Sequence, residues 1–112
     1  MPSVSQIYVI AAGDNTVKIG IARDPEKRRI ALQTGHYAPL KLAFSSPCKR
    51  PAVVEHLVHE SLASKRLYGE WFSASPQEAQ QAISEVIKRT RLPGESAPSV
   101  ESWAYSGAPV NC

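Results

Sequence analysis

Two short apolar runs separated by a turn constrain the fold of this chain more than any other feature. Residues 7–10 and 17–21 are rich in β-branched side chains, which suit a pleated, half-buried surface. The six residues between the runs read AAGDNT, and Gly, Asp and Asn favour tight turns because they tolerate positive φ angles. The pattern predicts a β-hairpin that is buried largely on both faces and carries two polar side chains, Tyr8 and Lys18.

Length and composition narrow the class of protein. A chain of 112 residues accommodates one domain with one core. No apolar run approaches the ~20 residues of a membrane span, and the N-terminus does not have the pattern of a signal peptide. Cys48 and Cys112 are far apart and fit neither a disulfide framework nor a zinc site, so we expect a reduced, cytoplasmic protein. A net charge of +3 and a pI near 9.0 are compatible with a polyanionic partner.

Further elements follow the hairpin along the chain. The patterns predict a helix over 25–34, a strand over 40–44, a helix from 51 to about 65, an extended segment over 67–72 and a helix from 76 to about 91. Asp24 followed by Pro25 is a typical helix start, and Ser75 with Glu78 forms a capping box. The order β-β-α-β-α-α predicts an α/β (α+β) domain, with a small antiparallel three-stranded sheet flanked by helices.

The composition changes near the C-terminus. Beyond Leu92 the sequence is rich in Pro, Ser, Gly and Glu and has no apolar periodicity. A segment of this kind cannot offset the entropy lost on ordering. We therefore predict a domain over residues 1–92 and a disordered tail over residues 93–112.

Several polar residues in this order of elements resemble the motifs of the GIY-YIG nuclease superfamily. Ile7-Tyr8-Val9 stands at the first signature and Lys18-Ile19-Gly20 at the second, where lysine replaces tyrosine as in a compact phage and bacterial branch. Arg28 falls where that family's helix carries its arginine, and Glu55 where it keeps a metal-binding glutamate. The resemblance covers residues 6–88. Ile7 departs from the leading glycine, and the late asparagine of the family has no counterpart.

The resemblance implies a GIY-YIG-like fold and a metal-dependent DNA endonuclease. Glu55 would hold Mg²⁺ or Mn²⁺, and Arg28 would bind two phosphate oxygens through its planar guanidinium. Tyr8 would position or deprotonate the attacking water, and Lys18 would stabilise its phenolate or contact the phosphate. Five further residues are expected to bind the substrate: Arg23, Lys27, Arg29, His36 and His59.

Each of these residues also has an ordinary structural interpretation. A strand tyrosine is usually a core residue, and a strand lysine usually protects a sheet edge. Glu55 and His59 would then form an exposed helical pair, and Glu70 would pair with Arg66. A zinc site at His56, His59 and Glu60 lacks the usual His-Glu-x-x-His order and a third ligand.

Two other functions compete with the endonuclease. One is a non-catalytic nucleic-acid-binding module that keeps the fold and its basic residues but has lost turnover. The other is a protein-interaction domain that uses the tail around Trp103 as a short linear motif. The sequence leaves open the oligomeric state and whether a protein partner supplies specificity.

Overall fold

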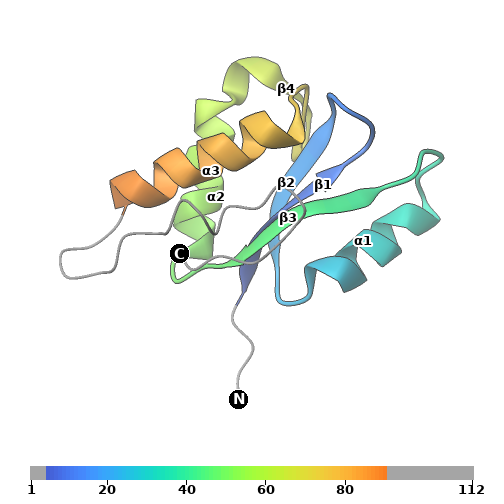
Figure 1. Ribbon diagram of the computed structural model, residues 1–112, viewed down its shortest axis with the longest axis horizontal. Helices are drawn as coiled ribbons and strands as arrows, with labels where there is room; N and C mark the ends of the chain where they lie inside the picture. The colour runs from blue at the N-terminus through green and yellow to red at the C-terminus, as the bar shows by residue number, and fades with distance from the viewer. Residues whose placement is uncertain (1–4, 91–112) are drawn as a thin grey trace.

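The predicted hairpin forms the centre of the sheet in a computed structural model that describes residues 5–90 (Figure 1). β1 (Gln6–Ala11) and β2 (Val17–Ala22) pair antiparallel, with Tyr8 directly opposite Gly20. Gly13 adopts a φ of +82° in the connecting turn, a conformation that glycine reaches without steric strain. Burial of the hairpin on both faces is confirmed.

The sheet has five antiparallel strands in the order β3-β1-β2-β5-β4. β3 (Lys41–Pro47) extends beyond the strand predicted at 40–44, while β4 (Arg66–Tyr68) and β5 (Trp71–Phe72) form a second, very short hairpin. The α+β class is confirmed, but the prediction of three strands was wrong. Strands of three and two residues are too short to show an alternating pattern, so the sequence indicated only an extended segment there.

Three α-helices cover the two faces of the sheet (Figure 1). α1 (Pro25–Thr34) lies on one face, and α2 (Pro51–Ser61) and α3 (Pro76–Thr90) lie on the other. A 3₁₀ turn, η1 (Ala63–Lys65), follows α2. The larger apolar cluster joins alternate residues of the central strands to α2 and α3, and a smaller cluster on the α1 face includes the ring of Tyr8.

The predicted helix starts are confirmed by their hydrogen bonds. Asp24 Oδ1 accepts the backbone N–H of Lys27 at 3.0 Å at the start of α1. At α3, Ser75 Oγ accepts the N–H of Glu78, and the Glu78 carboxylate accepts the N–H of Ser75, both at 3.1 Å. These contacts satisfy backbone donors that a helix N-terminus leaves without intrahelical partners.

Two further sequence predictions concern the C-terminal tail and membrane-spanning helices. The predicted tail of residues 93–112 lies outside the described residues and stays a prediction. Within residues 5–90, none of the helices combines the length and the apolar character needed to cross a membrane.

Candidate functional site

Tyr8 brings its hydroxyl to the α1 face of the sheet, directly over a glycine. Its side chain is 1% exposed, and its ring belongs to the smaller apolar cluster. A Cβ atom on Gly20 would lie 2.6 Å from the Tyr8 hydroxyl oxygen and 3.0 Å from Glu70 Oε1. Glycine at this position therefore lets the phenol and a carboxylate approach the β2 backbone closely.

Arg28 reaches the same hydroxyl from α1. Its guanidinium hydrogen-bonds the Tyr8 hydroxyl, although the residue as a whole is exposed. The next residue, Arg29, faces elsewhere: its guanidinium donates to Glu26 Oε1 at 2.6 and 2.9 Å and to the Leu40 carbonyl at 3.4 Å. Arg28 thus points from α1 toward the sheet, whereas Arg29 is held by Glu26 and the Leu40 carbonyl.

Lys18 and Glu70 form an ion pair beside Tyr8. Lys18 Nζ lies 3.0 Å from Glu70 Oε1 and 5.7 Å from the centroid of the Trp71 ring. Lys18 and Trp71 are direct neighbours across the β2–β5 pairing. The prediction that Glu70 pairs with Arg66 was wrong, because Arg66 Nε donates to the Gly69 carbonyl at 2.6 Å instead.

Glu70 is the residue that sequence reasoning missed at this site. It precedes a two-residue strand whose pairing with β2 gives no sequence pattern. The one signal was indirect: a lysine on a strand buried on both faces needs a nearby counter-charge. The acidic residue just before Trp71-Phe72 was a candidate for that role.

Glu55 enters the site from α2, along the edge of β2 that β5 leaves uncovered. The β2–β5 pairing covers only Val17 and Lys18. Beyond it, the carbonyl of Ile19 accepts a hydrogen bond from His59 Nε2 at 2.8 Å. His59 lies one turn after Glu55, so this bond fixes α2 beside β2 and sets the position of the glutamate.

The electrostatics of the site centre on two neighbouring carboxyl groups. Burial raises the pKa of Glu55 to about 7, helped by the charge of Glu70 and a hydrogen bond to it, while Lys18 lowers it. The Glu55 carboxyl group therefore stays protonated to a higher pH than an exposed glutamate. Burial also raises the pKa of Tyr8, and so do the charges of Glu70 and Glu55, against the lowering effect of Arg28. Tyr8 is therefore a protonated phenol at neutral pH.

The donor set fits a hard divalent cation. A cation between the two carboxyl groups would offset the burial and the Glu70 charge that oppose ionisation of Glu55, and Mg²⁺ commonly uses one or two carboxylates and keeps several waters. Within residues 5–90, no group of three or more His, Cys, Asp or Glu side chains is arranged to hold a metal ion. His56 pairs with Glu60 at 3.1 Å and His59 bonds the Ile19 carbonyl, so these two histidines do not converge.

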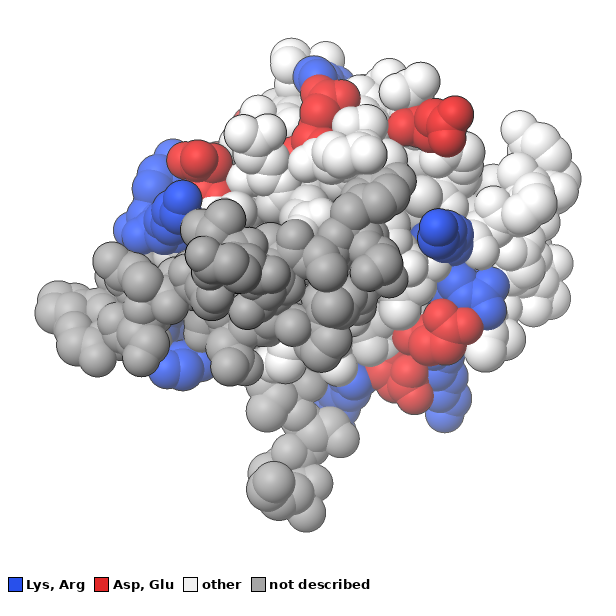
Figure 2. Space-filling model, in the orientation of Figure 1, with Lys and Arg blue, Asp and Glu red and all other residues white. Residues whose placement is uncertain are grey.

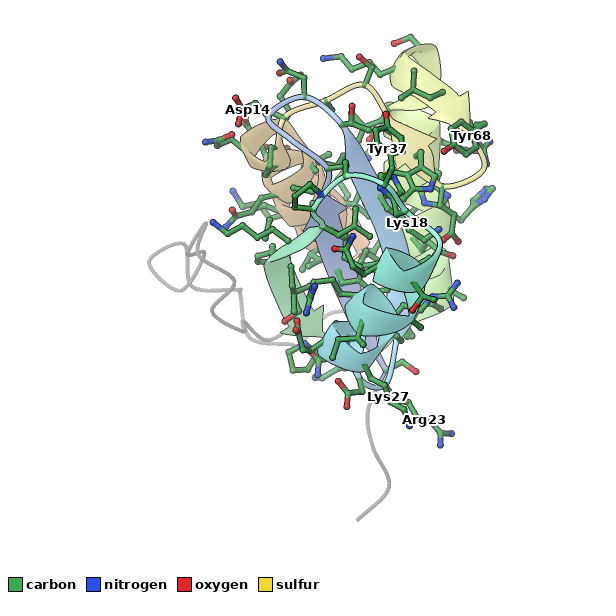
Figure 3. All side chains as sticks on the ribbon, turned by 90° about the vertical axis from the view of Figure 1, so that its right-hand side faces the viewer. Asp14, Lys18, Arg23, Lys27, Tyr37 and Tyr68 are labelled. Atoms are coloured by element: carbon green, nitrogen blue, oxygen red, sulfur yellow. The ribbon has the colours of Figure 1, made fainter. Side chains whose placement is uncertain are left out.

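The remaining predicted substrate residues are spread over the α1 side of the molecule. Figure 3 shows Lys18 in the upper half of the α1 side, with Arg23 and Lys27 exposed at its lower end. His36 lies in the loop after α1, where its ring stacks on Trp71 with centroids 5.5 Å apart. On the face drawn in Figure 2, several basic and acidic side chains lie beside one another.

The structure thus brings Tyr8, Lys18, Arg28 and Glu55 together and adds Glu70. His59 lies at the rim in a positioning role, and Arg29 is held by Glu26 and the Leu40 carbonyl.

The comparisons with known proteins correct the family assignment. The model of the T5orf172 domain matches residues 5–87, which is most of the chain. Neither the curated proteins nor the solved structures contain a match. Assignment to the GIY-YIG superfamily was therefore wrong, because the signature-like tripeptides are too short to separate families with similar strands. The chain belongs to the T5orf172 domain family.

Proposed function

We propose that this domain is a divalent-cation-dependent DNA endonuclease that hydrolyses phosphodiester bonds. The observation that carries the proposal is the carboxyl pair of Glu55 and Glu70, which meets Lys18, Arg28 and a buried tyrosine hydroxyl in one site. Residues far apart in the sequence converge there, and folding alone does not require the half-buried carboxyl group of Glu55 to lie beside a second carboxylate. Strongly shifted acids beside cations are common at catalytic sites.

The cationic side chains suit a phosphate. Arg28 is exposed and presents a planar guanidinium, which binds two phosphate oxygens at once and strengthens its hold as negative charge develops on them. Lys18 holds Glu70 in place through the 3.0 Å ion pair.

The raised pKa of Tyr8 supports one of its two predicted roles over the other. A phenol whose ionisation is opposed by burial and by two carboxylates is a poor base at neutral pH. We therefore retain positioning and drop deprotonation: the Tyr8 hydroxyl orients water or a phosphate oxygen by a hydrogen bond. The water oxygen forms its bond to phosphorus as the bond to the 3′ oxygen breaks; the water proton passes to solvent, and the 3′ oxygen takes a proton from solvent and leaves as a hydroxyl.

Glu55 and Glu70 are the residues that would hold the cation. When bound, the cation would neutralise phosphate charge and lower the pKa of the leaving oxygen. Glu55 must be ionised to bind it. Because the pKa of Glu55 is about 7, activity should rise with pH up to about that value and then level off.

A plasmid-nicking assay tests this function. Supercoiled plasmid is incubated with Mg²⁺ or Mn²⁺, with and without a chelator, and with wild type, Glu55→Gln and Glu60→Gln. Glu60 is the matched control, because it is exposed on the same helix and pairs with His56. We expect nicking by wild type and by Glu60→Gln, none with the chelator, and a loss of at least about a hundred-fold in Glu55→Gln. Nicking by Glu55→Gln at the wild-type rate would contradict the assignment.

A second candidate, the non-catalytic DNA-binding module, rests on one specific observation. Tyr8 is 1% exposed, and the charges of Lys18 and Glu70 neutralise each other. With the phenol buried and the lysine paired, the exposed Arg28 can bind a phosphate without hydrolysing it. DNA binding by wild type without nicking under either cation would favour this candidate.

A further inference from the structure

Three aromatic rings form a stack that leads outward from the site. The Tyr37 and His36 ring centroids are 5.5 Å apart and nearly parallel, at 5°. His36 and Trp71 follow at 5.5 Å and 27°, and Lys18 Nζ lies 5.7 Å from the Trp71 centroid. The stack therefore begins at a cation of the proposed catalytic site.

The two ends of the stack differ sharply in exposure. Trp71 is 8% exposed, whereas Tyr37 is 100% exposed. An aromatic ring in this position buries no apolar surface of its own in the core, so it adds little to the stability of the domain. Its outer π-face is open to solvent and continues the direction of the rings beneath it.

The loop that carries the stack is held by one glutamine. Gln33 Nε2 donates to the carbonyls of Ala38 at 2.9 Å and of His36 at 3.3 Å, and Gln33 Oε1 accepts the N–H of Leu40 at 2.7 Å. His36 Nδ1 lies 3.3 Å from the N–H of Ala38. Tyr37 is thus presented on a loop with fixed backbone contacts, and a ligand that stacks on it would need little further ordering.

The stack also lies on the same side of the molecule as the basic residues. In Figure 3, Tyr37 and Lys18 are in the upper half, and Arg23 and Lys27 are at the lower end. A DNA strand that follows this side would meet cations along its backbone and an aromatic face near the scissile phosphate. Single-strand binding sites combine these two features.

We propose that Tyr37 is a stacking surface for an unpaired base of the DNA substrate, next to the phosphate held by Arg28 beside the Lys18–Glu70 ion pair. The inference rests on the proposed function and deepens it by naming a substrate class. Bases inside a duplex already stack on their neighbours, so only a single-stranded, flapped or extrahelical nucleotide offers a free face. The substrate class is DNA with an unpaired nucleotide beside the cleavage point.

Binding measurements without cleavage test the proposal. A 12-nucleotide fluorescein-labelled single strand and the blunt duplex of the same sequence are titrated with the full chain in chelator, and fluorescence anisotropy gives Kd. Tyr37→Ala should weaken single-strand binding about five- to 150-fold and leave duplex binding unchanged. Tyr37→Trp should bind like wild type, and Tyr37→Leu should resemble Tyr37→Ala because it lacks a π-face.

Tyr68→Ala is the positional control, since Tyr68 is also exposed, at 67%, but is not part of the ring stack. We expect it to bind single strands like wild type. An unchanged Kd in Tyr37→Ala, an equal loss on the duplex, or an equal loss in Tyr68→Ala would each overturn the proposal. Selective single-strand binding without plasmid nicking would uphold the stacking surface while removing the hydrolytic function, so the two failures are distinguishable.

Discussion

Glu55 lies where burial and a neighbouring carboxylate both oppose its ionisation, so its proton links pH to folding. The pKa of Glu55 is about 7 in the folded domain, against an ordinary value near 4.5. Between these two values the folded state binds more protons than the unfolded state, and stability therefore falls as pH rises through this range. The fall should be complete above about pH 7, where both states are ionised.

The effect of Glu55 on the pH dependence of stability can be tested without substrate. The melting temperature of wild type should decrease between pH 5 and pH 8 more than that of Glu55→Gln, since glutamine has no proton to lose. Mg²⁺ should raise the melting temperature more at pH 8 than at pH 5, because cation and proton compete for the same carboxylate. Thermal denaturation with Glu60→Gln as control measures both effects. Parallel pH profiles for wild type and Glu55→Gln would refute the raised pKa.

Gly20 permits the close approach of the Tyr8 hydroxyl, and this gives a second prediction. In Gly20→Ala, the new Cβ would lie 2.6 Å from the hydroxyl oxygen and 2.8 Å from Cζ of a rigid, buried ring. The ring must move, so we expect the unfolding free energy to drop by about 1–3 kcal/mol and nicking to fall.

Gly35→Ala is the matched control for that variant. A Cβ there would have no atom within 4 Å, and the residue has an ordinary φ of −102°. Chemical denaturation should show no loss of stability in this control. Equal stability of Gly20→Ala and wild type would mean that Tyr8 has room to shift.

At the scale of elements, α2 is held at the uncovered edge of β2 by the hydrogen bond from His59 to the Ile19 carbonyl. We predict that His59→Ala lowers the unfolding free energy by about 1–3 kcal/mol, since the carbonyl loses its partner. Nicking should fall as well, because Glu55 lies one turn away on the same helix. Denaturation and nicking are measured beside His56→Ala, whose side chain is exposed and pairs only with Glu60 in the described structure. Loss of DNA binding with unchanged stability would instead make His59 a substrate contact.

Local sequence patterns predicted some elements of this fold and not others. The β1–β2 hairpin, α1 and both N-caps were predictable, because apolar runs, turn residues and capping side chains act within a few positions of one another. The β4–β5 hairpin was not, since β5 is held by pairing with distant β2 and β4 pairs only with the two-residue β5. Glu70 was misassigned for the same reason: its partner Lys18 is fixed by that pairing and lies far away in the sequence.

At the scale of the whole molecule, a few polar residues located the site but did not identify the family. Tyr8, Lys18, Arg28 and Glu55 were chosen from the sequence, and folding brings them together. The family is defined by the pattern of residues 5–87 as a whole, which short tripeptides represent poorly. The spacing of the motifs therefore predicted which side chains lie together better than it predicted the protein family.

Substitutions of Arg28 and Glu55 should separate DNA binding from turnover in the intact domain. Arg28 should serve both, because its charge attracts the phosphate in the ground state and binds it more strongly as charge develops. Arg28→Ala should therefore weaken DNA binding, reduce the slope of log K against log salt by about one, and reduce cleavage by about a hundred-fold or more. Arg89→Ala, an exposed arginine on α3, is the control.

Glu55 should serve mainly turnover, and its replacement should change affinity in the direction opposite to that of Arg28→Ala. Glu55→Gln removes a negative charge near the phosphate, so DNA should bind equally well or more tightly while cleavage is lost. The gain in affinity should grow from pH 6 to pH 8, because the Glu55 carboxyl group of wild type has a pKa of about 7 and ionises across this range. Anisotropy titrations in chelator at both pH values measure the gain. A gain that is the same at pH 6 and pH 8 would show that the phosphate is not close enough to sense this carboxylate.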